Sequence, residues 1–127
     1  MSRTHDVENE VTQLHQFFQD WYRGTLEDEG FQRFESVMGE GFEIILPNAA
    51  ILPRERIIEA VRGQKGSDGE AELWIENVRV VHSAESFIVA TYEEWQGRGG
   101  EPARGRLSTV VFRPDAEAPN GLVWLHV

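Results

Sequence analysis

The sequence of 127 residues contains no cysteine. This absence excludes disulfide bonds, thiol catalysis and metal sites with thiolate ligands. It fits a reducing compartment, and we expect the protein to be cytoplasmic. No apolar run approaches the length of about 20 residues that a membrane-spanning helix requires, and the N-terminal MSRTHDVENEV lacks the apolar stretch of a signal peptide. We therefore expect no membrane association.

Basic residues are also scarce, because 12 Lys and Arg stand against 22 Asp and Glu and the net charge is −10. Lys65 is the only lysine. Binding to a phosphate backbone requires clustered basic side chains, so we expect no nucleic-acid partner. No two of the four His have metal-site spacing, and no glycine-rich phosphate loop or nucleophile elbow is present. We expect neither a metal nor a cofactor.

The composition that remains is that of a globular protein, with 40% apolar and 27% charged residues. A chain of this length predicts one domain over residues 1–127, which can bury roughly two thirds of its unfolded surface. The final segment LVWLHV ends while still apolar, whereas strands usually end in polar or turn residues. We therefore expect the native chain to extend beyond Val127.

Apolar residues in the first third of the chain recur at steps of three and four, which predicts amphipathic helices. One helix spans Asp6–Tyr22 and ends at Gly24. A second short helix is expected over residues 31–38, closed by Gly39 and Gly41.

Pro53 suits the first turn of a third helix with the sequence RERIIEAV. The remaining segments have strand character; they are FEIILP and residues 71–81, 87–96, 104–113 and 122–127. Helices followed by a run of antiparallel strands predict an α+β fold, with the helices packed on one face of a strongly curved, mainly antiparallel sheet.

The segment around Gly99-Gly100 predicts a β-hairpin with these glycines as the two central turn residues. Side chains alternate across a strand, so this register sorts the hairpin residues into two faces. One face carries Phe87, Val89, Thr91, Glu93, Arg106, Ser108, Val110 and Phe112. The other carries Ile88, Ala90, Tyr92, Leu107, Thr109 and Val111.

Three features carry a family resemblance: the amphipathic first helix, the motif GFEIILPNAAILPRERIIEAV and the tail GRLSTVVFRP followed by GLVWLHV. In this order they resemble the nuclear transport factor 2-like superfamily, in particular its SnoaL-like and ketosteroid isomerase-like small bacterial domains. The resemblance implies a cystatin-like cone, in which a bent sheet wraps around the first helices and opens at one end into an apolar pocket. It also implies that dimers often form through the convex face of the sheet.

The catalytic groups of the ketosteroid isomerases are missing from the matching positions. Their base is an Asp directly before the proline of the first strand, where this sequence has Leu46. Their oxyanion donors are a Tyr on the first helix and an acid on the penultimate strand, which correspond to Phe17 and the neighbourhood of Val110. An isomerase of that mechanism is therefore disfavoured.

The resemblance turns the first hairpin face inward, together with a set on the preceding strand that contains Trp74, Glu76, Val78 and Val80. The candidate ligand-binding residues are then Trp74, Thr91, Glu93, Arg106, Ser108 and His126. Each has a simpler interpretation, because Glu93 and Arg106 could form an ordinary cross-strand ion pair and Trp74 could be core. Glu76 would be a candidate base if it were buried, and a solvated strand residue otherwise.

Two functions of different class follow from this sequence. The first is a small-molecule-binding domain or enzyme that takes an apolar or aromatic carbonyl compound in the cone. The second is a non-catalytic, dimeric association module. No predicted helix is left to cover the second hairpin face, so we expect a homodimer with Tyr92 and Leu107 near the centre of an interface of roughly 1,600 Å².

Overall fold

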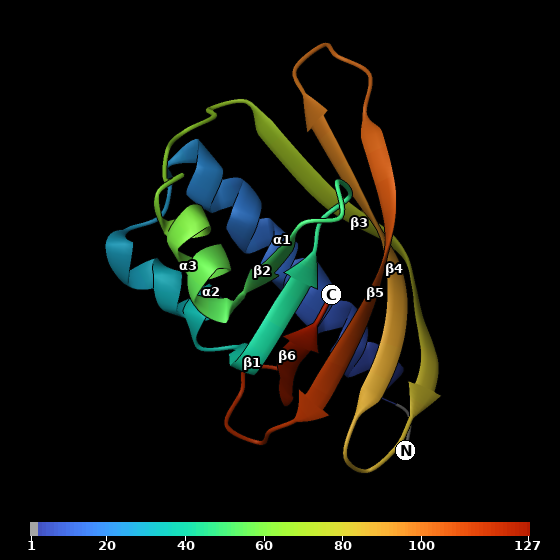
Figure 1. The fold of residues 1–127 in the computed structure, drawn as a ribbon. Helices are drawn as coiled ribbons and strands as arrows, with labels where there is room; N and C mark the ends of the chain where they lie inside the picture. The colour runs from blue at the N-terminus through green and yellow to red at the C-terminus, as the bar shows by residue number, and fades with distance from the viewer. Residues whose placement is uncertain (1–2) are drawn as a thin grey trace.

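The computed structural model describes residues 3–127. The helical elements are α1 (Thr4–Arg23), the short 3-10 helix η1 (Asp28–Phe31), α2 (Gln32–Glu35) and α3 (Arg54–Arg62). The strands are β1 (Met38–Ile45), β2 (Ile51–Pro53), β3 (Ala71–Ser83), β4 (Ile88–Arg98), β5 (Arg104–Pro114) and β6 (Leu122–His126). Figure 1 shows the long strands β3, β4 and β5 curving past one side of α1, with α2 and α3 on its other side.

The strands form one six-stranded sheet in the order β2-β1-β6-β5-β4-β3. β1 and β6 pair in parallel, and the other neighbours pair antiparallel. The predicted α+β cone, with helices on a curved and mainly antiparallel sheet, is confirmed. Its core lies between α1 and the concave face of the sheet.

The first helix forms as its apolar spacing predicts. Its buried stripe contains Val7, Val11, Leu14, Phe17 and Trp21. Gly24 ends the helix in the left-handed conformation, at φ 80°, and its N–H donates to the carbonyls at the end of α1. Glycine adopts this conformation without a Cβ penalty, which explains the position of the helix end.

The prediction for the second helix is wrong at its C-terminal end. The helical segment stops at Glu35, and Gly39 and Gly41 lie within β1 instead of closing a helix. A Cβ on Gly39 would lie 2.8 Å from the carbonyl oxygen of Trp124 on β6. This glycine therefore allows β1 and β6 to approach each other, which is a constraint between distant segments that the local spacing does not contain.

The predicted hairpin register is wrong by one residue. Thr91 lies opposite Thr109, and Glu94, not Glu93, lies opposite Arg106. The reason is that the connection is longer than two residues: β4 ends at Arg98 and β5 begins at Arg104. A shift of one residue moves every side chain of a strand to the other face.

As a result, the inward face of β4 consists of Ile88, Ala90, Tyr92 and Glu94, all of them buried. The inward face of β5 contains Ser108, Val110 and Phe112, as predicted. Half of the apolar patch assigned to the convex face is therefore core, and Tyr92 cannot lie at the centre of an outer interface.

A β-bulge in β3 corrects the inward set assigned to that strand. Pairing with β4 shifts between Glu76 and Arg79, and Asn77 adopts a φ of 53°. The extra residue reverses the alternation along the strand. Trp74 and Glu76 are consequently exposed on the outer face, whereas Val78 and Val80, which follow the bulge, pack against the core as predicted.

Candidate functional site

A cavity of about 150 Å³ lies inside the cone, between α1, α3, β1 and the concave face of the sheet. Most of its lining is apolar: Leu14, Phe18, Phe34, Met38, Phe42, Ile44, Leu46, Ile57, Val61, Trp124 and Val127. In the second half of β1, Phe42 and Ile44 face the cavity and alternate with the exposed Glu43 and Ile45. Leu46, which follows the strand, also lines the cavity, so the position that matches the isomerase base carries a leucine here.

One wall of the cavity is polar and contains a hydrogen-bonded pair of side chains from α1 and β4. Nε2 of His15 lies 2.8 Å from Oε1 of Glu94, and both side chains are buried. Arg106 on β5 places Nη2 3.2 Å from Oε2 of the same carboxylate. Gln96 donates to that oxygen over 2.6 Å. Three side chains from three elements therefore converge on Glu94.

The second ring nitrogen of His15, Nδ1, lies 2.8 Å from the carbonyl oxygen of Val11. A carbonyl oxygen can only accept, so Nδ1 carries a proton. Nε2 shares its hydrogen bond with the carboxylate of Glu94, so both ring nitrogens are engaged within the protein.

Burial acts to raise the pKa of Glu94. The partners of the carboxylate outweigh this effect and lower the pKa to about 2; in order of size they are His15, Arg106 and Gln96. The carboxylate is therefore ionised at neutral pH. A carboxylate with so low a pKa, and with three donors on its two oxygens, is a weak base.

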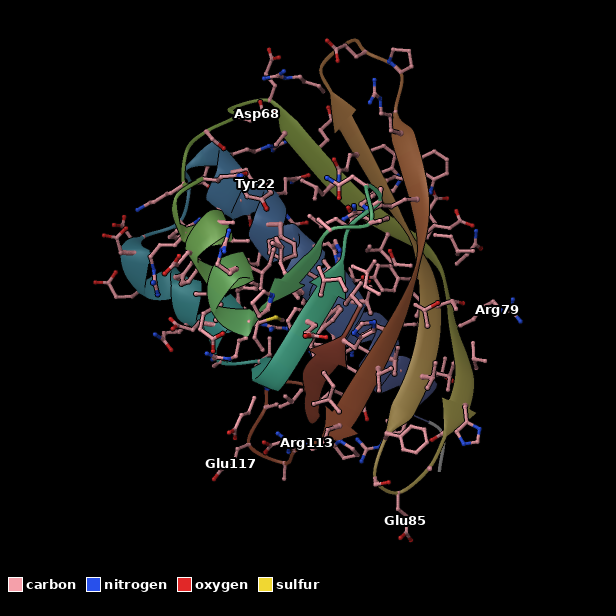
Figure 2. All side chains as sticks on the ribbon, in the orientation of Figure 1. Tyr22, Asp68, Arg79, Glu85, Arg113 and Glu117 are labelled. Carbon is pink, nitrogen blue, oxygen red and sulfur yellow. The ribbon has the colours of Figure 1, made fainter. Side chains whose placement is uncertain are left out.

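Two tyrosines complete the polar wall. Burial and the charge of Glu94 raise the pKa of Tyr22 to about 12, although the charge of Arg106 acts in the opposite direction. Burial and Glu94 also raise the pKa of Tyr92, although its hydrogen bond with Ser108 and the charge of Arg106 act in the opposite direction. Both phenols are neutral donors at neutral pH. Figure 2 shows Tyr22 near the end of α1 that faces the β4–β5 hairpin.

The six residues predicted to bind a ligand are divided between the inside and the outside of the sheet. Arg106 lines the cavity, whereas Ser108 does not line it but hydrogen-bonds to Tyr92, which does. Ser108 and His126 line a second, more open cleft of about 460 Å³ between β1 and β5. Trp74, Thr91 and Glu93 lie on the outer face, because of the bulge in β3 and the shifted register of β4. A ligand-binding role for these residues stays a prediction.

The outer-face residues form a separate group of contacts. The rings of Trp74 and Trp95 stack with centroids 6.3 Å apart. Their indole N–H groups donate to Glu76 and Glu93, respectively, each over 3.0 Å. Asn77 donates to the other oxygen of Glu93. The expected ion pair between Glu93 and Arg106 is therefore replaced by one between Glu94 and Arg106.

The sequence interpretation missed His15, Glu94 and Tyr22 as site residues. Two signals could have identified the first two. His15 lies four residues after Val11 and three before Phe18, and therefore on the apolar stripe of α1. Glu94 continues the alternation of Ile88, Ala90 and Tyr92, which places a carboxylate on a buried face, and a buried carboxylate requires partners.

Within residues 3–127 no group of three His, Asp or Glu side chains is arranged to hold a metal ion. None of the helices in the same range is long and apolar enough to cross a membrane.

The fold is that of the nuclear transport factor 2-like proteins, as the sequence resemblance implied. The chain belongs to the family described as sucrose-6-phosphate phosphohydrolase C-terminal, which matches residues 7–127. No curated protein matches the chain.

Three solved structures illustrate the shared fold. An NTF2-like protein of unknown function from Pseudomonas aeruginosa superposes with a TM-score of 0.85 at 23% identity, over 95% of this chain and 94% of that one. A protein from Thiobacillus denitrificans, provisionally described as a calcium/calmodulin-dependent protein kinase type II association domain, gives a TM-score of 0.58 at 23% identity, over 86% and 87%. An NTF2-like protein from Streptomyces avermitilis, provisionally described as a dehydratase, gives 0.62 at 17% identity, over 98% and 95%.

Proposed function

We propose that this chain is a small-molecule-binding domain whose cone cavity takes an apolar or aromatic carbonyl compound. The observation that carries the proposal is the division of the cavity into an apolar lining and a single polar wall at His15, Glu94 and Arg106. Ligand pockets combine a mostly apolar surface with a few convergent polar groups, and this division follows that pattern.

The polar wall also suggests the orientation of the ligand. Both contacts of Arg106 with Glu94 go through Nη2, and among the described residues no acceptor lies within hydrogen-bonding distance of its Nε or Nη1. These donors can bind a ligand oxygen. The apolar body would then lie against the aromatic rings of Phe18, Phe42 and Trp124.

The chemistry of the wall favours binding over proton-transfer catalysis. The Streptomyces avermitilis protein is provisionally described as a dehydratase. A dehydratase requires a group that accepts a proton. Glu94 is a weak base here, and both ring nitrogens of His15 are engaged in hydrogen bonds within the protein. Neither group presents a free basic site to a ligand.

Two adjacent isoleucines of β1 test this proposal. Ile44 lines the cavity, whereas Ile45 is 52% exposed. Ile44→Trp should fill the cavity and abolish the binding of acetophenone-sized carbonyl compounds measured by calorimetry, whereas Ile45→Trp should bind as the wild type does. Circular dichroism checks that both variants fold. Binding that survives Ile44→Trp, or a wild type that binds no such compound, would refute the proposal.

A second candidate is the association module, with a homodimer formed through the outer face of the sheet. The observation that favours it is an exposed apolar group on this face, where Leu107 is 75% exposed and Trp74 is 37% exposed beside Trp95. The Thiobacillus denitrificans protein that is provisionally described as an association domain has the same fold. The centre of such an interface would be Leu107 and Trp95, since Tyr92 is buried.

A further inference from the structure

The geometry points to an apolar monocarboxylate as the ligand class of the cone cavity. This inference rests on the proposed binding function and narrows the carbonyl compound to an anion. It is carried by the excess of donors on the polar wall, by the unused donors of Arg106 and by the size of the cavity.

The polar wall offers more hydrogen-bond donors than acceptors. Among the described residues that line it, Glu94 is the one side-chain carboxylate, and His15, Gln96 and Arg106 all bond to it. A bound carboxylate would supply two further acceptors beside the guanidinium of Arg106.

The unused donors of this wall belong to Arg106. His15 is fully engaged, because both of its ring nitrogens are bonded within the protein. Arg106 is not, because its Nε and Nη1 have no acceptor among the described residues, and its side chain is 40% exposed at the border of the cavity. A guanidinium presents two parallel donors that match the two oxygens of a carboxylate. The neutral phenol of Tyr22 is a further donor on the same wall.

The size of the cavity limits the ligand. Its volume is about 150 Å³, and an apolar protein cavity of about this size binds benzene. The rings of Phe18, Phe42 and Trp124 form the apolar surface that such a body would contact. The predicted ligand is thus one ring, or an aliphatic chain of similar volume, with one carboxylate.

Three planar compounds of nearly the same shape and different charge test this inference: benzoate, benzamide and benzamidine. We expect calorimetry on the wild type to show benzoate binding about 10-fold or more tightly than benzamide, because a charge-assisted pair is stronger than a neutral one. Benzamidine, which is a cation, should not bind detectably.

The variants separate the role of Arg106 from general effects of charge. Arg106→Met should remove the preference for benzoate over benzamide, and Arg106→Lys should retain most of it. Arg79→Met is the matched control, because Arg79 extends away from β3 into solvent and does not line the cavity (Figure 2). This variant should keep the wild-type preference.

The outcomes distinguish the inference from the function on which it rests. If benzamide binds the wild type as tightly as benzoate, the anionic ligand class is wrong and the binding function stands. If the preference persists in Arg106→Met or disappears in Arg79→Met, the assignment to this wall is overturned. If none of the three compounds binds, and acetophenone-sized compounds do not bind either, the proposed function itself fails.

Discussion

The imidazole of His15 and the carboxylate of Glu94 form a buried hydrogen-bonded pair over 2.8 Å, although 79 residues separate them in the chain. The pair joins α1 to β4 inside the cone. Desolvation makes a buried charge costly unless it is paired and hydrogen-bonded, and both members here have further partners. This contact therefore fixes the helix against the sheet and at the same time forms the polar wall of the cavity.

The pair makes stability depend on pH in a defined direction. The pKa of Glu94 in the folded protein is about 2, below its ordinary value of 4.5, so the ionised carboxylate favours the folded state. This contribution is fully present above about pH 5 and is lost as the pH falls towards 2, and it amounts to about 3 kcal/mol.

Denaturant titrations of the wild type and Glu94→Gln between about pH 7 and pH 2 measure this contribution. The free energy of unfolding should fall more steeply for the wild type than for the variant as the pH decreases. Glu85→Gln is the control, because Glu85 extends into solvent from the loop between β3 and β4 and should follow the wild type (Figure 2). Parallel curves for the wild type and Glu94→Gln would contradict the assignment.

A second buried carboxylate, Glu10, holds the other end of the cone together. Its side chain is fully buried and accepts hydrogen bonds from Arg33, Asn120 and Nε1 of Trp124, the last over 2.7 Å. Glu10→Ala would leave the indole N–H and the guanidinium without their acceptor. We expect a loss of about 3 kcal/mol or more in the free energy of unfolding, measured by urea denaturation.

Gln13 provides the matched control for this variant. It lies on the same helix, accepts from the same Asn120 over 2.9 Å and is exposed. Gln13→Ala should change the free energy of unfolding by less than about 0.5 kcal/mol. If the two variants are equally stable, the bonds of Glu10 do not stabilise the fold in the way that their geometry implies.

The association module makes its own prediction for the outer face. If two sheets pack around Leu107 and Trp95, Leu107→Glu should convert a dimer into a monomer, because a charge at the centre of an apolar interface is left unpaired. Ile51→Glu is the control, since Ile51 is 58% exposed on β2 at the other edge of the sheet. Light scattering at micromolar concentration measures both, and a wild type that is monomeric under these conditions argues against the module.

The overall fold could be predicted from local patterns, and the site could be predicted only in part. The apolar stripe of α1 and the order of helices and strands depend on neighbouring residues, and both are confirmed. Which face of β4 points inward depends on the length of the loop after Arg98 and cannot be derived from the strand itself. The same applies to β3, where one extra residue near Asn77 exchanges the faces.

The individual residues of the polar wall show the same difference. Arg106 was identified because the β5 half of the hairpin was assigned to the correct face. Glu94 was missed because the one-residue shift exchanged it with Glu93, which bonds to Trp95 on the outer face. His15 was missed because its partner is 79 residues away, and only the assembled fold brings the two together.

The indole N–H signals of the four tryptophans provide the most direct test of the central claim, that the cone cavity is the binding site. Trp124 lines the cavity, whereas Trp74 and Trp95 stack on the outer face of the sheet. In a titration with benzoate followed by NMR, the account predicts a saturable shift of the Trp124 Nε1–H signal, with the signals of Trp74 and Trp95 unchanged. A shift confined to Trp74 and Trp95, with Trp124 unaffected at saturation, would contradict it.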